Sequence, residues 1–237
     1  MSGPIVSIVT PTWNQLSFIQ GHVESIKRHT PQPHQIIVID NGSRDATTPW
    51  LERSLRQQDI IVRNIENRGF AKANNQGLAL AEGEYVLFLN NDIEVLEDTW
   101  LDKLVEGVKD ADLVGPNLCK VFPVEQQKVF LYEGEGTTED KWHYIEGWCL
   151  FGRKEKFLAI DGWCEDFFPT YCDDSDLGFR AKVAGLKMKK VPVPIKHFGN
   201  QAFPNYEKFM NTNANDITLK NSRKLYQKWV VDFKGNF

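Results

Sequence analysis

The stretch YVLFLNND, from Tyr85 to Asp92, decides the fold that this chain is expected to adopt. Its first five residues are all apolar, which is typical of a strand buried on both faces in the middle of a parallel sheet. Asn90, Asn91 and Asp92 follow without a break, so the strand ends in polar side chains. The stretch therefore predicts a central strand with polar groups at its carboxyl end.

Three apolar runs of strand length lie before this stretch and alternate with helical patterns. We expect strands at Pro4–Thr10, Gln35–Asp40 and Ile60–Asn64, and helices at residues 16–26, 45–57 and 71–81. Strands that alternate with helices indicate an α/β fold with a mostly parallel central sheet flanked by helices. Ala73, Gly77 and Leu80 give the third helix a narrow face, which would let it lie close to the sheet.

The regular alternation of strands and helices ends after about residue 97. A helix at 98–109 and a short strand at 113–114 precede a region rich in Gly, Trp and Glu that runs to about residue 163. Its aromatic residues fit a variable binding surface and the core of a mixed sheet equally well; they are Trp142, Tyr144, Trp148 and Trp163. Beyond it we expect a helix at 173–185, an edge strand at 188–193 and a basic amphipathic helix at 206–229.

Length and composition indicate one large globular domain. The chain has 237 residues, of which 41% are hydrophobic and 25% charged, an ordinary balance for a protein that buries a substantial core. We therefore expect a single domain over residues 1–237. It divides into a first half at about 1–97, a second half at about 98–204 and a helical tail at about 205–237.

Charge and hydrophobicity exclude several classes of partner. The net charge of −4 and the pI of about 5.8 provide no positive field for a polyanion, so nucleic acid is not expected as a partner. The apolar runs are strand-sized and far shorter than the roughly 20 residues of a membrane span. No signal-peptide pattern opens the sequence. We expect a cytoplasmic chain whose four cysteines stay reduced.

Polar residues gather where the predicted strands end. Thr10 and Asn14 follow the first strand, Asp40 and Asn41 end the second, and residues 90–92 end the fourth. Ligands of an open parallel sheet bind beyond the carboxyl ends of its strands, so these side chains should share one crevice. The sequence contains neither G-x-G-x-x-G after its first strand nor a P-loop, which removes the commonest dinucleotide and P-loop interpretations.

Asp92 and Asp174 are the carboxylates best placed for chemistry. Asp92 could hold Mg²⁺ or Mn²⁺ together with substrate phosphate oxygens, or could satisfy backbone donors in a turn. Asp173, Asp174 and Asp176 open a helix, where capping alone explains one of them. We expect Asp176 to pair with Arg180, four residues later, at the surface. Asp174 is then free to act as a general base, with capping as the alternative.

Three other polar residues have two interpretations each. His197 could ligate a metal ion or make a structural hydrogen bond. Arg68 and Lys72 flank a helix start, where cations and free backbone amides can meet a phosphate, but a solvated helix end explains them equally well. The residues alone leave these alternatives open.

Four stretches of the chain, taken together, resemble the inverting glycosyltransferases with the GT-A fold, a group often called family two. The stretches are SIVTPTWNQ at Ser7–Gln15, VIDNGSRDAT at Val38–Thr47, NRGFAKANNQGLALAEGEYVLFLNNDIEV at Asn67–Val95 and DDSDLGFRAKVAG at Asp173–Gly185. Each is weak alone, but their order and intervals are specific. The likeness covers about residues 6–200.

The resemblance implies a single Rossmann-like GT-A domain with a nucleotide-sugar-binding first half and a more irregular second half for catalysis and the acceptor. The residues implied to bind the nucleotide are Thr10, Pro11, Thr12, Asn14, Asp40, Asn67, Gly69, Lys72, Asn90 and Asn91. Asp40 would contact the base. Asn90-Asn91-Asp92 takes the place of the family's metal-binding D-x-D motif, and His197 matches a histidine that completes the metal site in many relatives.

The same resemblance assigns catalysis to Asp174, which matches the Asp of the family's E-D motif, where it is the catalytic base. Asp173 replaces the usual Glu, and with Trp148 it is expected in the acceptor or sugar pocket. Asn90 replaces the first carboxylate of D-x-D, a substitution common among relatives that resemble rhamnosyltransferases and cell-surface polysaccharide enzymes. Asp92 then remains as the anionic residue of the motif.

These expectations describe a metal-dependent inverting glycosyltransferase that uses Mn²⁺ or Mg²⁺. Its donor would be a nucleotide diphosphate sugar, with UDP or dTDP favoured, and its acceptor a hydroxyl of a glycan or lipid-linked molecule. One alternative is a non-catalytic nucleotide-sugar or carbohydrate binding module on the same fold. Another is a nucleotidyltransferase, but PTWNQ is not the glycine-rich basic loop such enzymes usually carry. The basic tail could contact the inner membrane face, although a solvated helix face explains it as well.

Overall fold

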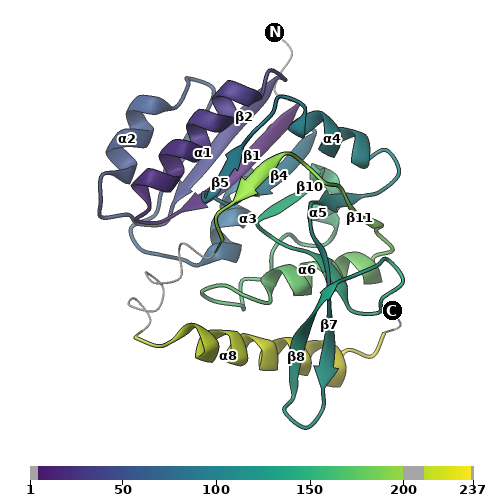
Figure 1. The fold of residues 1–237 in the computed structure, drawn as a ribbon. Helices are drawn as coiled ribbons and strands as arrows, with labels where there is room; N and C mark the ends of the chain where they lie inside the picture. The colour runs from purple at the N-terminus through teal and green to yellow at the C-terminus, as the bar shows by residue number, and fades with distance from the viewer. Residues whose placement is uncertain (1–4, 200–210, 236–237) are drawn as a thin grey trace.

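The computed structural model describes residues 5–199 and 211–235 and arranges them around one central sheet (Figure 1). The sheet has seven strands in the order β11-β6-β10-β4-β1-β2-β3. Their bounds are β1 (Val6–Thr12), β2 (His34–Asp40), β3 (Ile60–Arg63), β4 (Tyr85–Leu89), β6 (Leu113–Gly115), β10 (Cys149–Arg153) and β11 (Met188–Lys190). Strands β3, β2, β1 and β4 run parallel, which confirms the mostly parallel sheet, whereas β10 is antiparallel to both of its neighbours.

Strand β4 lies in the middle of this sheet, as its apolar sequence predicts. Successive side chains of a strand point to opposite faces, and here Leu87 joins one buried cluster while Phe88 joins the other. All five residues of β4 are buried. Both faces of β4 are covered, so a ligand can meet this strand only at its ends. The polar residues 90–92 follow its carboxyl end.

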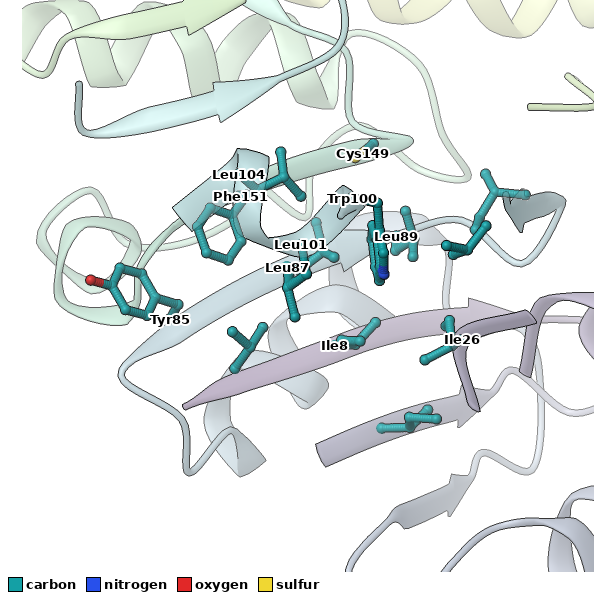
Figure 2. Packing of buried hydrophobic residues seen from close by; sticks show 14 of the residues in the cluster. Ile8, Ile26, Tyr85, Leu87, Leu89, Trp100, Leu101, Leu104, Cys149 and Phe151 are labelled. Atoms are coloured by element: carbon teal, nitrogen blue, oxygen red, sulfur yellow. The ribbon is translucent and has the colours of Figure 1, made fainter. Parts of the chain in front are cut away.

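Helices cover both faces of the sheet. One face packs against α1 (Leu16–His29), α2 (Thr47–Ser54) and α4 (Trp100–Gly107), and the other against α3 (Phe70–Leu80), α5 (Lys154–Ala159) and α6 (Asp173–Val183). Figure 2 shows the first of these cores, in which Trp100 and Leu104 of α4 lie with Ile8 and Leu87 of the sheet. The helix at the second face that matters most for the site is α6.

Helix α3 approaches the sheet closely because small residues line its inner face. A Cβ atom at Gly77 would lie 2.2 Å from Val9 Cγ1, so a larger residue would push the helix away. Ala73 is fully buried, as predicted. The prediction that Leu80 belongs to this face was wrong, because the buried stripe continues through Leu78 and leaves Leu80 exposed.

Two smaller antiparallel sheets complete the fold. In one, β5 (Ile93–Val95) pairs with β12 (Ile195–His197). In the other, β7 (Leu118–Val124), β8 (Val129–Glu135) and β9 (His143–Ile145) pair in the order β8-β7-β9. The β7–β8 hairpin lies beside α8 (Ala214–Tyr226) in Figure 1. The region expected to be irregular therefore contains a regular hairpin.

The aromatic residues of the second half divide between core and cavity. Trp142 packs against Phe179 with ring centroids 4.9 Å apart, and Tyr144 and Trp163 are buried. Trp148 instead lines the cavity described below. The core interpretation is therefore confirmed for Trp142, Tyr144 and Trp163, and the binding-surface interpretation stays a prediction for Trp148.

The C-terminal segment packs against α6 and the β7–β8 hairpin. The predicted start of its helix, at residue 206, lies outside the described residues; α8 begins at Ala214 with Asn213 as its N-cap. It continues into a π-helix, η1 (Gln227–Asp232), and buries Tyr226 and Trp229 against the aromatic cluster of the second half. Its exposed face carries Lys220, Arg223 and Lys224. Across the described ranges, no helix has both the length and the apolar character needed to cross a membrane.

Candidate active site

A cavity of about 400 Å³ opens where β1 and β4 end, at the edge of the sheet where the strand-end pattern predicts a site. Nine predicted site residues line it, namely Pro11, Thr12, Asn90, Asn91, Asp92, Trp148, Asp173, Asp174 and His197. Its other lining residues are Trp13, Gln15, Asn41, Phe70, Glu146, Gly147, Thr170, Tyr171 and Gly199. The volume falls within the range of about 300–1,000 Å³ that is usual for small-molecule sites.

Asp92 and His197 meet where β5 pairs with β12. His197 lies opposite Ile93 in this pair, and the Phe198 N–H donates to the carbonyl oxygen of Asp92 at 2.9 Å. Asp92 Oδ1 is 3.3 Å from His197 Nε2, within ion-pair distance, yet neither buried atom makes a hydrogen bond. The indole of Trp148 stacks on the imidazole of His197 with centroids 4.3 Å apart and so restricts the plane of that ring.

Asp92 Oδ1 and His197 Nε2 are buried and make no hydrogen bond, and both are suitable ligand atoms for a divalent cation. Neighbouring ligand atoms on a Mg²⁺-sized ion lie about 3 Å apart, because each stands about 2.1 Å from the metal. The separation of 3.3 Å between Asp92 Oδ1 and His197 Nε2 is close to this value. Within residues 5–199 and 211–235, no group of three or more His, Cys, Asp or Glu side chains forms a fuller set. The other ligands of such an ion would be water and substrate oxygens.

His22 and Thr10 form a buried pair close to Asp92. Burial lowers the pKa of His22 to about 3, although the Asp92 carboxylate acts in the opposite direction, so the imidazole is neutral. His22 Nε2 and Thr10 Oγ1 share a hydrogen bond of 2.9 Å, and both side chains are fully buried. Thr10 therefore does not line the cavity in this structure, because its hydroxyl is engaged by His22.

Asn91 connects the loop after β4 to the end of β1. Its Nδ2 donates to Thr12 Oγ1 at 3.0 Å and to Gln15 Oε1 at 2.8 Å. The N–H of Asn90 donates to the carbonyl oxygen of Trp148 at 2.9 Å. Gln15 was not predicted as a site residue, although it ends the quoted stretch SIVTPTWNQ.

Asp40 and Asn14 are held by the loop that follows β2. Asp40 is fully buried; its Oδ1 accepts from the Ser43 N–H at 2.8 Å and its Oδ2 from the Thr48 hydroxyl. Asn14 accepts from the Arg44 N–H at 2.7 Å. Neither residue lines the cavity. The predicted contact of Asp40 with a nucleotide base would require this loop to rearrange.

Asn67, Gly69 and Lys72 lie at the start of α3, and none of them lines the cavity. Asn67 Oδ1 accepts from the Gly69 N–H at 2.8 Å. Gly69 has φ of 85°, and a Cβ there would stand 2.8 Å from the ring of Phe168. Lys72 pairs with Glu165 at 3.2 Å. From this segment it is Phe70 that reaches the cavity wall.

Asp174 is held near the N-terminus of α6 with its carboxylate at the cavity wall. Its Oδ1 accepts from the Ser175 N–H at 2.8 Å and its Oδ2 from the Gly147 N–H at 3.3 Å. Burial raises the pKa of Asp174 to about 6; the Gly147 hydrogen bond opposes this shift and the Glu146 carboxylate adds to it. A carboxylate with a pKa near neutral can both accept and release a proton during turnover.

Asp173 differs from Asp174 although the two are adjacent. It is 3% exposed and belongs to the cavity lining, and its buried Oδ2 has no hydrogen-bond partner. Burial raises the pKa of Asp173 well above its ordinary value, and repulsion from Asp174 acts in the same direction. Burial and the neighbouring charge therefore favour the protonated form of Asp173 more than that of Asp174.

The backbone just before α6 is left-handed at two residues that are not glycine. Tyr171 has φ of 74° and Cys172 has φ of 66°. Such conformations cost energy and persist where surrounding contacts enforce them, often at functional sites. Here Asn221 of α8 supplies one contact, because its Nδ2 donates to the carbonyl oxygen of Thr170 at 2.8 Å.

Asp176 and Arg180 pair as predicted, but the prediction that this pair lies at the surface was wrong. Asp176 is fully buried because η1 covers this part of α6. Its carboxylate accepts from Arg180 Nε at 2.8 Å, from Trp229 Nε1 at 2.8 Å and pairs with Lys228 Nζ at 2.7 Å. A buried carboxylate needs several such partners to offset its lost hydration.

The mostly parallel sheet, with its polar cavity at the ends of β1 and β4, has the GT-A fold. The chain belongs to glycosyl transferase family 2, whose family model matches residues 7–164. Asp174 and His197 lie beyond the matched residues. Membership in the family confirms the resemblance on which the predicted fold rests.

Named relatives match all or part of the chain. The O-antigen biosynthesis protein RfbC of Myxococcus xanthus is 29% identical over 78% of this chain and 16% of its own length. The putative glycosyltransferase EpsH of Bacillus subtilis is 27% identical over 100% of this chain and 69% of its own. The O-antigen chain rhamnosyltransferase RfbN of Salmonella typhimurium is 30% identical over 44% of this chain and 33% of its own length. The chain spans well under half the length of most curated relatives it matches.

Two solved structures confirm the GT-A fold. The mannosyltransferase PcManGT from Pyrobaculum calidifontis, in complex with GDP-Man and Mn²⁺, has a TM-score of 0.64 at 18% identity and covers 94% of this chain and 70% of its own. GalNAc-T7 with UDP, GalNAc and Mn²⁺ has a TM-score of 0.75 at 16% identity, and the match covers 98% of this chain and 49% of GalNAc-T7.

Proposed function

We propose that this chain is an inverting glycosyltransferase of polysaccharide biosynthesis. It would move a hexosyl or deoxyhexosyl unit from a nucleotide diphosphate sugar to a hydroxyl of a glycan or lipid-linked acceptor. The observation that carries this proposal is that Asp174, a carboxylate with a pKa of about 6, lines the same cavity as the Asp92–His197 pair. A base and a site for a charge-neutralising cation are the two devices that direct displacement of a diphosphate requires.

Asp92 and His197 would hold the cation, Mn²⁺ or Mg²⁺. When bound, it would neutralise charge on the departing nucleotide diphosphate. The described lining of the cavity supports this assignment, because it contains the carboxyl groups of Asp92, Glu146, Asp173 and Asp174 and no Lys or Arg. PcManGT and GalNAc-T7 were both solved with Mn²⁺, which adds support.

In the proposed reaction, Asp174 removes the proton of the acceptor hydroxyl. The acceptor oxygen forms a bond to the anomeric carbon while the bond from that carbon to the phosphate oxygen breaks, and the nucleotide diphosphate leaves. Attack and departure take place on opposite faces of the sugar ring, so the anomeric configuration inverts. Asp174 is left protonated and returns its proton to water before the next turnover.

The donor side of the cavity would lie beside Pro11, Thr12, Asn90 and Asn91, which line it. The other residues predicted for the nucleotide, including Asp40 and Asn67, would act through the loops that they hold. UDP and dTDP remain the favoured nucleotides. Likeness to the rhamnosyltransferase RfbN supports a deoxyhexosyl donor, whereas PcManGT was solved with GDP-Man, so GDP-sugars belong in the same test.

The experiment that tests this function is a screen of UDP-, dTDP- and GDP-sugars for binding and slow hydrolysis, each with Mn²⁺ and with a chelator. We expect one donor to bind and hydrolyse with Mn²⁺ and to lose most of its affinity with the chelator. The anomeric configuration of a transfer product, read by NMR, then tests inversion. Donor binding without hydrolysis or transfer would favour the non-catalytic binding module, and no binding of any donor would contradict the proposal.

We place the chain in the cytoplasm. The exposed basic face of α8 supports its peripheral contact with a membrane that carries a lipid-linked acceptor. Because Tyr226 and Trp229 are buried, such contact would rest on charge at Lys220, Arg223 and Lys224. We expect sedimentation with acidic-lipid vesicles at low salt and release at high salt, since screening weakens exposed charges. Absence of sedimentation at low salt would exclude this contact.

A further inference from the structure

Glu146 is a cavity residue that the proposed reaction does not use. It lies in the segment between β9 and β10, directly before Gly147, whose N–H donates to Asp174. Its carboxylate is close enough to raise the pKa of Asp174. Glu146 therefore stands on the side of the cavity where the attacking hydroxyl must lie, next to the proposed base.

The carboxylate of Glu146 is held in place by two donors. Its Oε2 accepts from Asn117 Nδ2 at 2.6 Å and from Trp148 Nε1 at 2.8 Å, and its backbone N–H donates to the carbonyl oxygen of Asn117 at 3.2 Å. Both of these hydrogen bonds use Oε2, and the Cys119 thiol also interacts with the carboxylate. A side chain fixed in this way loses little further conformational freedom when a ligand binds, which favours recognition.

The charge around Glu146 limits what can bind beside it. Of the described residues that line the cavity, four carry carboxyl groups and none is Lys or Arg. Asp173 adds a buried Oδ2 that has no hydrogen-bond partner among the described residues. An acceptor carboxylate or phosphate placed here would lie beside the carboxylates of Glu146 and Asp174, with no Lys or Arg in the described lining to pair with it. Specific sites use such repulsion to reject a ligand.

We propose that Glu146 recognises the acceptor and selects its charge. Its carboxylate accepts a hydrogen bond from a hydroxyl or amino group on the acceptor sugar, close to the hydroxyl that Asp174 deprotonates. The acceptor sugar is therefore neutral or an amino sugar, and uronic acids and phosphorylated sugars are rejected. This inference rests on the proposed function and names the acceptor class of the same site.

The test compares neutral and anionic acceptors. The probes are p-nitrophenyl glycosides of glucose, galactose and mannose, each beside its uronic acid and its 2-amino-2-deoxy analogue, with the donor found in the screen. We expect kcat/KM on the best neutral sugar to exceed that on its uronic acid at least ~10-fold, as expected for a like-charge contact. Glu146→Gln, which keeps the size of the side chain, should reduce this ratio about fivefold or more, chiefly through the acceptor KM.

Two other variants make the result specific. Asn117→Ala removes one donor but leaves the charge, so it should raise the acceptor KM while the preference for neutral over uronic sugar persists. Glu139→Gln changes an exposed glutamate outside the cavity and should leave that preference unchanged. An unchanged ratio in Glu146→Gln, with a melting temperature like that of the wild type, overturns the inference.

A binding version of the experiment needs no turnover. Ligand-observed NMR of the same glycosides, with UDP, dTDP or GDP and Mn²⁺ present, should show weaker binding of uronic acids to the wild type than to Glu146→Gln. If this difference appears without donor hydrolysis, the acceptor inference stands and the catalytic proposal fails. If donors are hydrolysed and transferred but the charge preference is the same in both proteins, the acceptor inference alone fails.

Discussion

Asp174 differs from the other carboxylates of the cavity in its surroundings. Asp92 faces His197, and Asp173 is buried against its neighbour, but Asp174 has two backbone donors and a pKa of about 6. It is thus ionised at neutral pH and still basic enough to take a proton. The sequence predicts this residue from its place at the start of a helix; its pKa depends on Gly147 and Glu146, which no local pattern connects to it.

Asp174→Asn should nearly abolish transfer without abolishing donor binding. An amide cannot accept the acceptor proton, and loss of a general base costs about 10²- to 10⁴-fold in rate. The measurements are kcat with the best acceptor and donor affinity by calorimetry. Asp166→Asn, at an exposed carboxylate outside the cavity, is the matched control. Turnover within tenfold of the wild type would reject Asp174 as the base.

The rate of transfer should depend on pH through the same carboxyl group. Because Asp174 must be ionised to act and its pKa is raised to about 6, kcat/KM should fall as pH decreases below about 6. Asp173 and Asp174 are adjacent, so the observed value belongs to the pair. A profile of kcat/KM from pH 4.5 to 8 checks this. An inflection near pH 4 instead would place the base in a more solvated setting.

The raised pKa of Asp174 also predicts an effect on stability. The folded protein binds this proton more tightly than the unfolded chain, so the group's contribution to stability is complete below about pH 4 and is lost as pH rises through about 6. An Asn side chain does not ionise, so Asp174→Asn avoids the cost of burying this charge at high pH. The substitution should increase the free energy of unfolding by about 1–3 kcal/mol at pH 7.5. Urea unfolding at pH 4 and pH 7.5 measures it; a gain of equal size at both pH values would refute the cause given.

At the scale of elements, α6 depends on the C-terminal segment. Asp176 is buried under η1, where Arg180, Lys228 and Trp229 surround its carboxylate. The spacing of Asp176 and Arg180 predicts their pairing, but nothing in it indicates burial. Burial follows from a contact between segments far apart in the sequence, which periodicity within one helix does not report.

Trp229→Phe should destabilise the protein through this contact. The ring still fills its place against Phe179, but Asp176 loses one donor in a buried setting, which costs about 1–3 kcal/mol. The free energy of unfolding in urea measures the effect. Val231→Ala, at an exposed residue of the same segment, is the control. Equal effects of the two substitutions would show that the hydrogen bond to Asp176 adds nothing.

The β7–β8 hairpin shows why part of the second half could not be predicted. Its turn, Glu125 to Lys128, contains no Gly, Asn or Asp, although Lys128 adopts φ of 54°. Pro123 also argues against a strand. It is tolerated because β9 pairs only with Leu118 to Lys120, so β7 is an edge strand beyond that point.

At the scale of the whole molecule, the first half follows closely from sequence and the second does not. Alternation of strands and helices predicts β1 to β4, because each parallel strand needs a crossover helix. The same logic fails for β10, which returns antiparallel between β4 and β6. Likewise, the rule that polar residues at strand ends meet in one crevice holds for Asn41 and Asp92, which line the cavity. It fails for Asp40, which is drawn into its own loop by Ser43 and Thr48.

The buried contacts of Asp176 have a consequence for how the protein is made. Trp229 lies 53 residues after Asp176, so during synthesis the helix that carries Asp174 emerges from the ribosome long before the residues that complete its surroundings. Until then, the Asp176 carboxylate lacks Lys228 and Trp229 as partners and must stay hydrated. Helix α6 can therefore reach the surroundings described here only after Trp229 has been translated.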